Sequence, residues 1–264
     1  MNWKQLFIEY WSSQKKEDAA HDLEHFKRVA YTAQQIAHLE TTSSDPLILL
    51  AAAYFHDLVN LPKNHPQRHL ASRHSADKAK TILMKAGFPN KKIPAVCHAI
   101  QAHSFSAQIE PLTLEAKIIQ DADRLEALGA IGILRTFYIS SRMGSSPYDP
   151  LDPLAKMRPL DDGTFALDHF ACKLFKLPDH MQTLGGRQIA QDRSKFLQRF
   201  VEELVTDLQK GSGAAFMIVE SCQHAGQENQ PFSFIIKMLK KNSMSSSFMT
   251  EFLSQLEREM QIDE

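Results

Sequence analysis

The chain has 264 residues, 43% of them hydrophobic, and a formal net charge of −1 at pH 7. This length allows a sizeable core, in one large domain or in one domain with an appendage. The near-neutral charge supplies no global positive field for nucleic acid or an anionic membrane, so we expect neither partner.

Helical periodicity begins near residue 22. Apolar residues recur at steps of three and four over residues 22–39, which predicts an amphipathic helix with Asp22 as its N-cap. Asp45-Pro46 has the form of an N-cap followed by a helix-opening proline. The apolar run over 47–58 predicts a buried central helix, and the polar stretch 60–68 interrupts the helices.

The rest of the chain is also predicted to be helical, with one long interruption. Helices are expected over residues 70–85, 91–103, 112–129 with an extension toward 141, 164–176, 185–210 and 248–260. Residues 142–163 hold four prolines and two glycines, which predicts a long loop of the kind that is often functional. Ser243–Ser247 predicts a flexible break. No strand pattern is present, so the predicted fold class is all-α.

The pattern predicts a domain over residues 1–210 with a C-terminal tail. The domain would have a core at about 20–145 and a helical extension at 146–210. The tail, 211–264, would be helical in part.

The three cysteines are widely spaced, and no CxxC motif is present in the sequence. They form neither a disulfide framework nor a zinc knuckle, and unpaired thiols suit a reducing compartment. The N-terminus lacks a signal-peptide pattern, and the longest apolar run is too short to cross a bilayer. We therefore expect a cytoplasmic protein.

Two histidines and two carboxylates in the order His25, His56-Asp57, Asp123 carry the most chemical information. Imidazole and carboxylate ligands together suit Mn, Fe, Co, Ni or Zn, and such a site can hold and activate water. The doublet ends the apolar helix, which would place an ion at the floor of a cleft with dry walls. Each residue taken alone would more often be an ordinary surface or helix-end residue.

Asp121 and Asp123 lie in the otherwise apolar segment IIQDADRLEALGAIG. Acidic side chains there are costly to bury unless a cation or hydrogen bonds compensate them. Two positions apart on a helix they cannot face the same way, so one should be a ligand and the other a supporting or capping group. Surface ion pairs are the alternative for Arg124 and Glu126.

The chain resembles the HD-domain phosphohydrolase superfamily, and within it the stand-alone bacterial YedJ-like members. The resemblance covers roughly residues 15–208. It rests on the segments AAHDLEHFKRV, YFHDLVNLPKNHPQR, AVCHAIQAHSFSAQIEPLT, AKIIQDADRLEALGAIGI and RPLDDGTFALDHFACKLFKLP.

This resemblance implies an all-helical bundle with one divalent ion at its centre, which could be Mn, Fe, Co, Ni or Mg. Its ligands would be His25, His56, Asp57 and Asp123, since the family's last ligand precedes a basic residue, as in ADRL. The implied reaction is hydrolysis of phosphate esters or anhydrides, commonly of nucleotides. For nucleoside triphosphates it would release pyrophosphate or phosphate.

Basic residues near the ion are expected to bind a phosphorylated small-molecule substrate. Lys63, His65 and Arg68 follow the doublet closely, and Arg124 follows the last expected ligand. An arginine can hold phosphate through two hydrogen bonds. A solvated loop is the alternative for the first three.

Asp57, His98 and His103 are the candidate catalytic residues. The two histidines could act as general acid, contact phosphate or bind a second ion, while Glu126 and His169 are weaker candidates. No carboxylate occurs in Leu58–Leu61 after the doublet, where some relatives carry a glutamate. We therefore hypothesise attack by metal-bound water, assisted by Asp57 or a histidine.

Two other functions remain open on the sequence: a nucleotide-binding sensor without turnover, and a phosphodiesterase. A complete ligand set favours turnover over sensing. The absence of an aromatic-basic stripe disfavours nucleic acid as substrate, and the GYP motif of cyclic-dinucleotide hydrolases is absent. The sequence is compatible with a homo-oligomer and with more than one small phosphorylated substrate.

Overall fold

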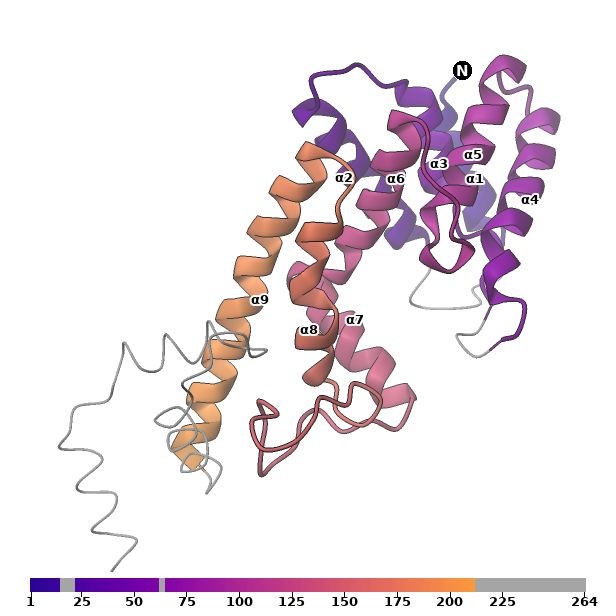
Figure 1. Cartoon of the computed structure of the whole chain (residues 1–264). Helices are drawn as coiled ribbons and strands as arrows, with labels where there is room; N and C mark the ends of the chain where they lie inside the picture. Colours follow the sequence, from indigo (N-terminus) through magenta and orange to yellow (C-terminus); the bar gives the residue numbers. More distant parts are fainter. Residues whose placement is uncertain (15–21, 62–64, 212–264) are drawn as a thin grey trace, which may run out of the picture. The chain divides into compact units, whose positions relative to one another are not determined.

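The computed structural model of the chain describes residues 1–14, 22–61 and 65–211. Within these ranges the regular secondary structure is helical, apart from one isolated β-bridge between Ser146 and Phe165, and this confirms the predicted all-α class (Figure 1). The α-helices are α1 (Trp3–Ser12), α2 (Leu23–Leu39), α3 (Pro46–Phe55), α4 (Ala71–Lys85), α5 (Ile93–His103), α6 (Leu114–Arg124), α7 (Gly129–Arg142), α8 (Asp168–Cys172) and α9 (Leu184–Gly211). Short 3-10 helices are η1 (Arg68–Leu70), η2 (Asn90–Lys92), η3 (Phe105–Ala107), η4 (Leu125–Ala127) and η5 (Leu174–His180).

The two predicted N-caps form as the sequence indicates. The Asp22 carboxylate accepts a hydrogen bond from the His25 amide at 3.0 Å. The Asp45 carboxylate accepts from the amides of Leu47 and Ile48 at 2.9 and 3.3 Å, with Pro46 opening the helix. These caps satisfy amides that have no partner inside the helix and so fix where α2 and α3 begin.

Helix α3 is the centre of the core, as its apolar composition predicts. Seven of its ten residues are buried, and it contacts α2, α5 and α6 (Figure 1). Three consecutive alanines, 51–53, are fully buried, and their small side chains let neighbouring helices approach. Phe55 is also fully buried, so its truncation to alanine should cost about 3–5 kcal/mol.

Helix α1 was not predicted. Its Phe7 ring packs against Phe55 with the ring centroids 4.8 Å apart, and the Trp11 indole Nε1 donates to the Tyr54 carbonyl oxygen at 2.8 Å. An aromatic face on α1 thus covers the end of α3 that leads into the His-Asp doublet.

The predicted helix over 112–129 and beyond is divided, and the expectation of one continuous helix was wrong. Helix α6 ends at Arg124, η4 follows, and Leu128 is extended (φ −116°, ψ 164°) before α7 begins. Gly129 has φ +71°, a conformation that glycine adopts without the strain of a side chain. The break gives α7 a direction of its own.

Contacts divide the chain into two units. The first comprises Met1–Met143 and Lys173–Leu197, and the second comprises Gly144–Cys172 and the chain from Gln198. The domain boundaries expected from the sequence remain a prediction.

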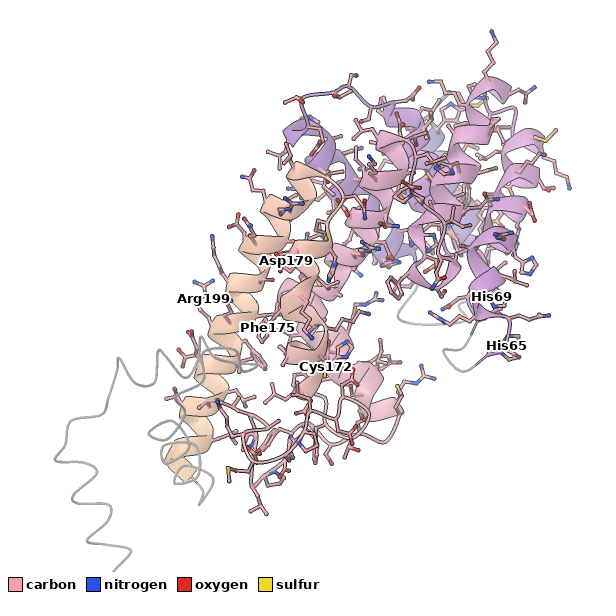
Figure 2. All side chains as sticks on the ribbon, in the orientation of Figure 1. His65, His69, Cys172, Phe175, Asp179 and Arg199 are labelled. Atoms are coloured by element: carbon pink, nitrogen blue, oxygen red, sulfur yellow. The ribbon has the colours of Figure 1, made fainter. Side chains whose placement is uncertain are left out.

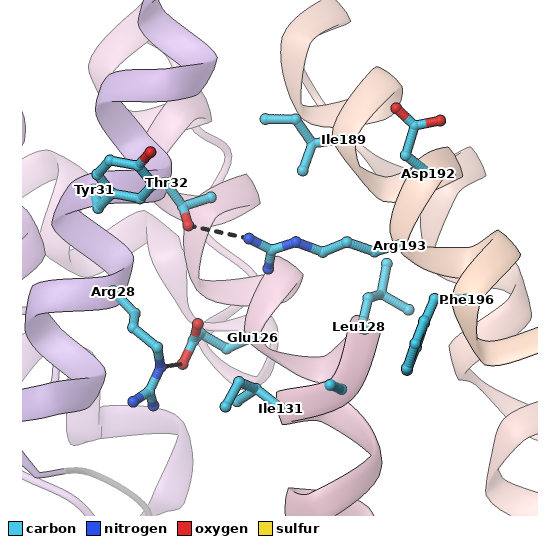
Figure 3. A pocket seen from close by; sticks show the side chains of 12 residues that line it. Arg28, Tyr31, Thr32, Glu126, Leu128, Ile131, Ile189, Asp192, Arg193 and Phe196 are labelled. Atoms are coloured by element: carbon cyan, nitrogen blue, oxygen red, sulfur yellow. Dashed lines mark hydrogen bonds and ion pairs between the residues drawn. The ribbon is translucent and has the colours of Figure 1, made fainter. Parts of the chain in front are cut away.

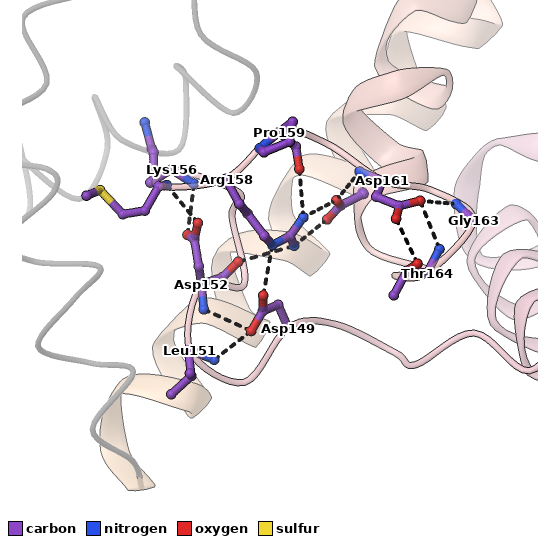
Figure 4. A network of polar contacts seen from close by, with 11 residues as sticks. Asp149, Leu151, Asp152, Lys156, Arg158, Pro159, Asp161, Gly163 and Thr164 are labelled. Atoms are coloured by element: carbon purple, nitrogen blue, oxygen red, sulfur yellow. Dashed lines mark hydrogen bonds and ion pairs between the residues drawn. The ribbon is translucent and has the colours of Figure 1, made fainter.

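In the second unit, Arg158 organises the loop that was predicted over 142–163 (Figure 4). Its guanidinium donates to both oxygens of the buried Asp168 carboxylate at 2.6 and 3.0 Å and to Asp149 at 2.9 Å. It also lies 4.3 Å from the centroid of the Phe165 ring. The predicted helix over 164–176 is shorter than expected, because only α8 forms before η5 begins.

The expected flexible break at Ser243–Ser247 and the helix over 248–260 lie outside the described residues. Among the helices of the described residues, none combines the length and apolarity that a bilayer span requires.

Candidate metal centre

Four helices deliver the predicted metal ligands and one predicted catalytic histidine to the same place. His25 lies in the first turn of α2, His56 and Asp57 directly follow α3, His103 is the last residue of α5, and Asp123 lies in the last turn of α6. His25 and His56 are fully buried, and His103 is nearly so. All five residues belong to the first unit.

The first donor group consists of His25, His56 and Asp123. The two histidine Nε2 atoms are 3.2 Å apart, and the Asp123 Oδ1 atom lies 3.7 Å from the first and 3.6 Å from the second. In an octahedral shell with bonds of about 2.1 Å, neighbouring donors are about 3 Å apart and opposite donors about 4 Å. The observed separations match a set of atoms that converge on one cation.

The second donor group consists of His56, Asp57 and His103, whose ligand atoms also lie within 4.8 Å of one another. The Asp57 carboxylate spans the two rings, with Oδ2 3.7 Å from His56 Nε2 and Oδ1 3.3 Å from His103 Nε2. The two groups share His56. Of the four predicted ligands, Asp57 therefore groups with His103, while the other three group together.

Each of the three imidazoles is oriented through its Nδ1 atom. The His56 Nδ1 lies 2.9 Å from the Ala53 carbonyl oxygen, and the His103 Nδ1 lies 2.6 Å from the Ile100 carbonyl oxygen. A carbonyl oxygen only accepts, so both Nδ1 atoms carry a proton and Nε2 is left as the electron-pair donor. Such a backbone partner fixes the tautomer and ring angle of a metal-binding histidine.

The buried Glu126 orients the third ring. Its Oε2 lies 3.3 Å from His25 Nδ1 and accepts a hydrogen bond from Arg28 Nε at 2.8 Å. The sequence had placed Glu126 only among the weaker candidates and had not singled out Arg28. The available signal was the three-residue step from His25 to Arg28, which puts both on one face of α2.

The electrostatics of the centre call for a positive charge. Burial alone lowers the pKa of His56, but the Asp57 and Asp123 carboxylates outweigh it and raise that pKa to about 9. Burial works to raise the pKa of Asp123, yet the hydrogen bond to His56 and the neighbouring imidazoles bring it well below its usual range. The pKa of His25 is lowered, chiefly by burial.

Two imidazoles 3.2 Å apart beside carboxylates hold one proton more readily than two, so the charge on His56 adds to the lowering of the His25 pKa by burial. In the metal-free centre this proton supplies the positive charge that a bound cation would supply. Three imidazole nitrogens and carboxylate oxygens are also the donors that divalent transition ions prefer. The residues present therefore fit a divalent metal ion.

Asp121 has a different role from Asp123, as a separation of two positions on a helix requires. It is fully buried, and its carboxylate accepts hydrogen bonds from the amides of Gln182 and Thr183 and from the Thr183 hydroxyl, at 2.7–3.0 Å. A Cβ atom on Gly186 would lie 2.4 Å from Asp121 Oδ2. Asp121 thus holds the segment that leads into α9.

Three of the predicted substrate-binding residues make hydrogen bonds with groups outside the two donor groups. Lys63 lies outside the described residues. His65 precedes η1 at the N-terminal end of α4, where its Nδ1 accepts from the Gln67 amide at 3.1 Å (Figure 2). The Arg68 guanidinium donates to the Leu61 carbonyl oxygen. The Arg124 guanidinium donates to the His180 carbonyl oxygen at 2.8 Å.

The candidate catalytic residue His98 and the weaker candidate His169 make their hydrogen bonds elsewhere. The His98 Nε2 accepts from the Leu112 amide at 3.0 Å, which ties α5 to the segment before α6. His169 belongs to the second unit, where its Nδ1 lies 2.8 Å from Asp162 Oδ2. The helical geometry that separates His98 from His103 leaves His103 as the histidine that meets the donors.

Comparison with known proteins gives one family and a set of similar bacterial structures. The HD domain family model matches residues 22–128. The uncharacterized protein YpgQ of Bacillus subtilis is 33% identical over 196 residues, which is 73% of this chain and 86% of YpgQ.

Two of the similar crystal structures are informative. YpgQ in complex with ADP has a TM-score of 0.57 and 29% identity, covering 77% of this chain and 92% of YpgQ. An HD-superfamily hydrolase from Bacillus thuringiensis has a TM-score of 0.60 and 29% identity, covering 78% of this chain and 96% of the hydrolase.

Proposed function

The chain belongs to the HD-domain superfamily, and from this premise we propose that it is a metal-dependent phosphohydrolase acting on a small phosphorylated metabolite, specifically a nucleotide. One observation carries the proposal. Buried imidazoles with protonated Nδ1 atoms present their Nε2 atoms, with carboxylate oxygens, within 4.8 Å of one another in each donor group.

His25, His56, Asp57 and Asp123 would hold the ion. When bound, the ion would lower the pKa of water and draw charge from phosphoryl oxygens. Ligand chemistry leaves Mn, Fe, Co, Ni and Mg as candidates, and manganese is our first choice for assay because carboxylate and imidazole ligands both suit it.

The remaining groups orient and handle protons. Glu126, itself held by Arg28, orients the His25 ring through Nδ1, and the Ala53 carbonyl oxygen orients the His56 ring through Nδ1. His103 contacts Asp57 Oδ1 at 3.3 Å, so these two side chains form the pair through which a proton can move. Phosphoryl transfer depends mainly on such positioning and on charge stabilisation.

Two further points concern the substrate and its compartment. The complex of YpgQ with ADP supports a nucleotide as the ligand. We assign phosphate binding to His65, Arg68 and Arg124 and to Lys63, because they are basic residues that closely follow the His-Asp doublet or Asp123 along the chain. The widely spaced cysteines support a cytoplasmic location.

The test is a panel of nucleoside and deoxynucleoside mono-, di- and triphosphates with metal-stripped protein refilled with Mn, Ni, Co or Mg. Products are resolved by chromatography, and His56→Ala is assayed beside the natural chain. Hydrolysis that requires metal and disappears in the variant is expected, and its products identify the bond that breaks. Binding of a nucleotide without turnover under every metal would instead favour a sensor.

A further inference from the structure

A cavity of about 530 Å³ is lined in part by Arg28 and by Glu126, the carboxylate that contacts His25 Nδ1 (Figure 3). Its lining residues come from α2, the η4–α7 junction and the part of α9 before Gln198, and all of them belong to the first unit. It shares Arg28 and Glu126 with the support of the metal centre, but none of the five donor residues lines it. Its volume is within the range of small-molecule sites.

Among the residues that the structure describes, none offers a carboxylate at hydrogen-bond distance from Arg193, a positive charge on the cavity wall. Its guanidinium donates to the Leu125 carbonyl oxygen at 2.7 Å and to the Thr32 hydroxyl at 3.4 Å, both neutral acceptors. Burial lowers its pKa, and only the more distant charge of Glu126 opposes that effect. A guanidinium has five N–H donors, so several remain for a ligand.

The other charges on the cavity wall are already paired. Arg28 Nε donates to Glu126 at 2.8 Å, and Asp192 accepts from Lys195 at 2.9 Å. An anion entering beside Arg193 would therefore compensate the charge in this cavity that has only neutral hydrogen-bond acceptors.

The start of α7 adds hydrogen-bond donors to the same wall. Gly129, Ala130 and Ile131 line the cavity, and their amides are in the first turn, where a helix has no internal acceptor for them. No side chain caps this end, and its first turn holds no acidic residue. The helix terminus thus complements Arg193 as a second source of positive potential.

The rim of the cavity is apolar and partly aromatic. Tyr31 is 62% exposed, Phe196 is 39% exposed and Ile131 is 36% exposed. Flat, exposed rings next to a guanidinium suit a ligand that has a planar or apolar part as well as a charged one.

We propose that this cavity is a second ligand site, separate from the metal donors, for a small molecule that joins an oxyanion to a flat apolar group. Arg193 and the first amides of α7 bind the oxyanion, which is a phosphate or a carboxylate. Tyr31, Phe196 and Ile131 contact the apolar part.

The test is calorimetric titration of the full-length, metal-stripped chain, in which the metal centre cannot bind the oxyanion through an ion. Phenylphosphonate and benzoate serve as the two oxyanion probes, inorganic phosphate as the oxyanion alone and benzyl alcohol as the ring alone. We expect one saturable site, at least threefold tighter for the better oxyanion probe than for phosphate or benzyl alcohol. The tighter of the two oxyanion probes identifies the anion.

Two variants connect the binding to this cavity. Arg193→Gln removes the guanidinium, and Ala130→Asp places a carboxylate at the start of α7, where it favours the helix while repelling an anion. Each should weaken binding at least tenfold, and Arg73→Gln, on the exposed face of α4, should not. Ala130→Asp should keep the melting temperature and manganese stoichiometry of the natural chain, so it decides the test even if Arg193→Gln does not fold. Absence of saturable binding, equal binding of benzyl alcohol, or unchanged affinity in Ala130→Asp would overturn the proposal.

Discussion

Replacement of Glu126 by glutamine should weaken metal binding although Glu126 is not itself a proposed ligand. The variant keeps the size of the side chain and one oxygen but removes the negative charge beside His25 Nδ1 and Arg28. Loss of such a supporting carboxylate typically costs 10- to 100-fold in metal affinity. The His25–Glu126 contact, at 3.3 Å, is longer than a charge-assisted hydrogen bond of about 2.8 Å. We therefore expect the lower end, about tenfold, which corresponds to about 1.4 kcal/mol.

The assay is competition for Mn²⁺ against a fluorescent chelator, with thermal melting of the metal-free protein as the check on folding. Glu24→Gln is the matched control, because Glu24 lies in the first turn of α2, next to His25, and its exposed carboxylate forms an ion pair with Lys27 rather than with the His25 ring. It should change affinity less than twofold. Equal metal affinity in Glu126→Gln and the natural chain would refute the assigned orienting role.

Three further predictions follow from individual residues. The pKa of His56 is about 9 in the folded metal-free protein, above its ordinary value of 6.5. Protonated His56 therefore adds at most about 3 kcal/mol to the free energy of unfolding. This contribution should be fully present below pH 6.5 and lost as the pH rises through 9. Denaturant unfolding of chelator-treated protein across this pH range should show the decrease in stability. An equal decrease in His56→Ala would contradict its assignment to His56. Asp121→Ala should lower the free energy of unfolding by about 2–4 kcal/mol while metal stoichiometry stays the same, whereas Asp123→Ala should abolish metal binding; the reverse pattern in a metal assay would exchange the two roles. His103→Ala should reduce kcat about 10²- to 10⁴-fold and His98→Ala only a few-fold, and steady-state kinetics giving His98 the larger effect would count against the pairing of His103 with Asp57.

The sequence was most informative where local rules decide the structure. The caps at Asp22 and Asp45 and the apolar run of α3 specify those helices without help from distant residues, and they place His25 and His56 at helix ends. The two-residue spacing of Asp121 and Asp123 correctly required two different surroundings. It did not by itself say which was which, because that depends on the contact with Thr183, more than fifty residues away.

The features that were missed depend on tertiary contacts. Helix α1 packs its aromatic residues against α3. From the sequence, this segment supported only the expectation that it is not a signal peptide. The break before Gly129 reflects a positive φ that a helical periodicity does not report. The Arg28–Glu126 pair joins residues 98 positions apart, so the sequence could name Glu126 as a weak candidate but could not supply its partner.

The most direct test of the central claim is a metal titration in which bound ion and turnover are measured on the same samples. Metal-stripped protein is refilled stepwise with Mn²⁺, and nucleotide hydrolysis is recorded at each occupancy for the natural chain and for His56→Ala. We expect hydrolysis to rise in proportion to bound Mn²⁺, and we expect His56→Ala neither to retain the ion nor to turn over substrate. Hydrolysis at full rate in the metal-stripped chain, or in His56→Ala, would contradict it.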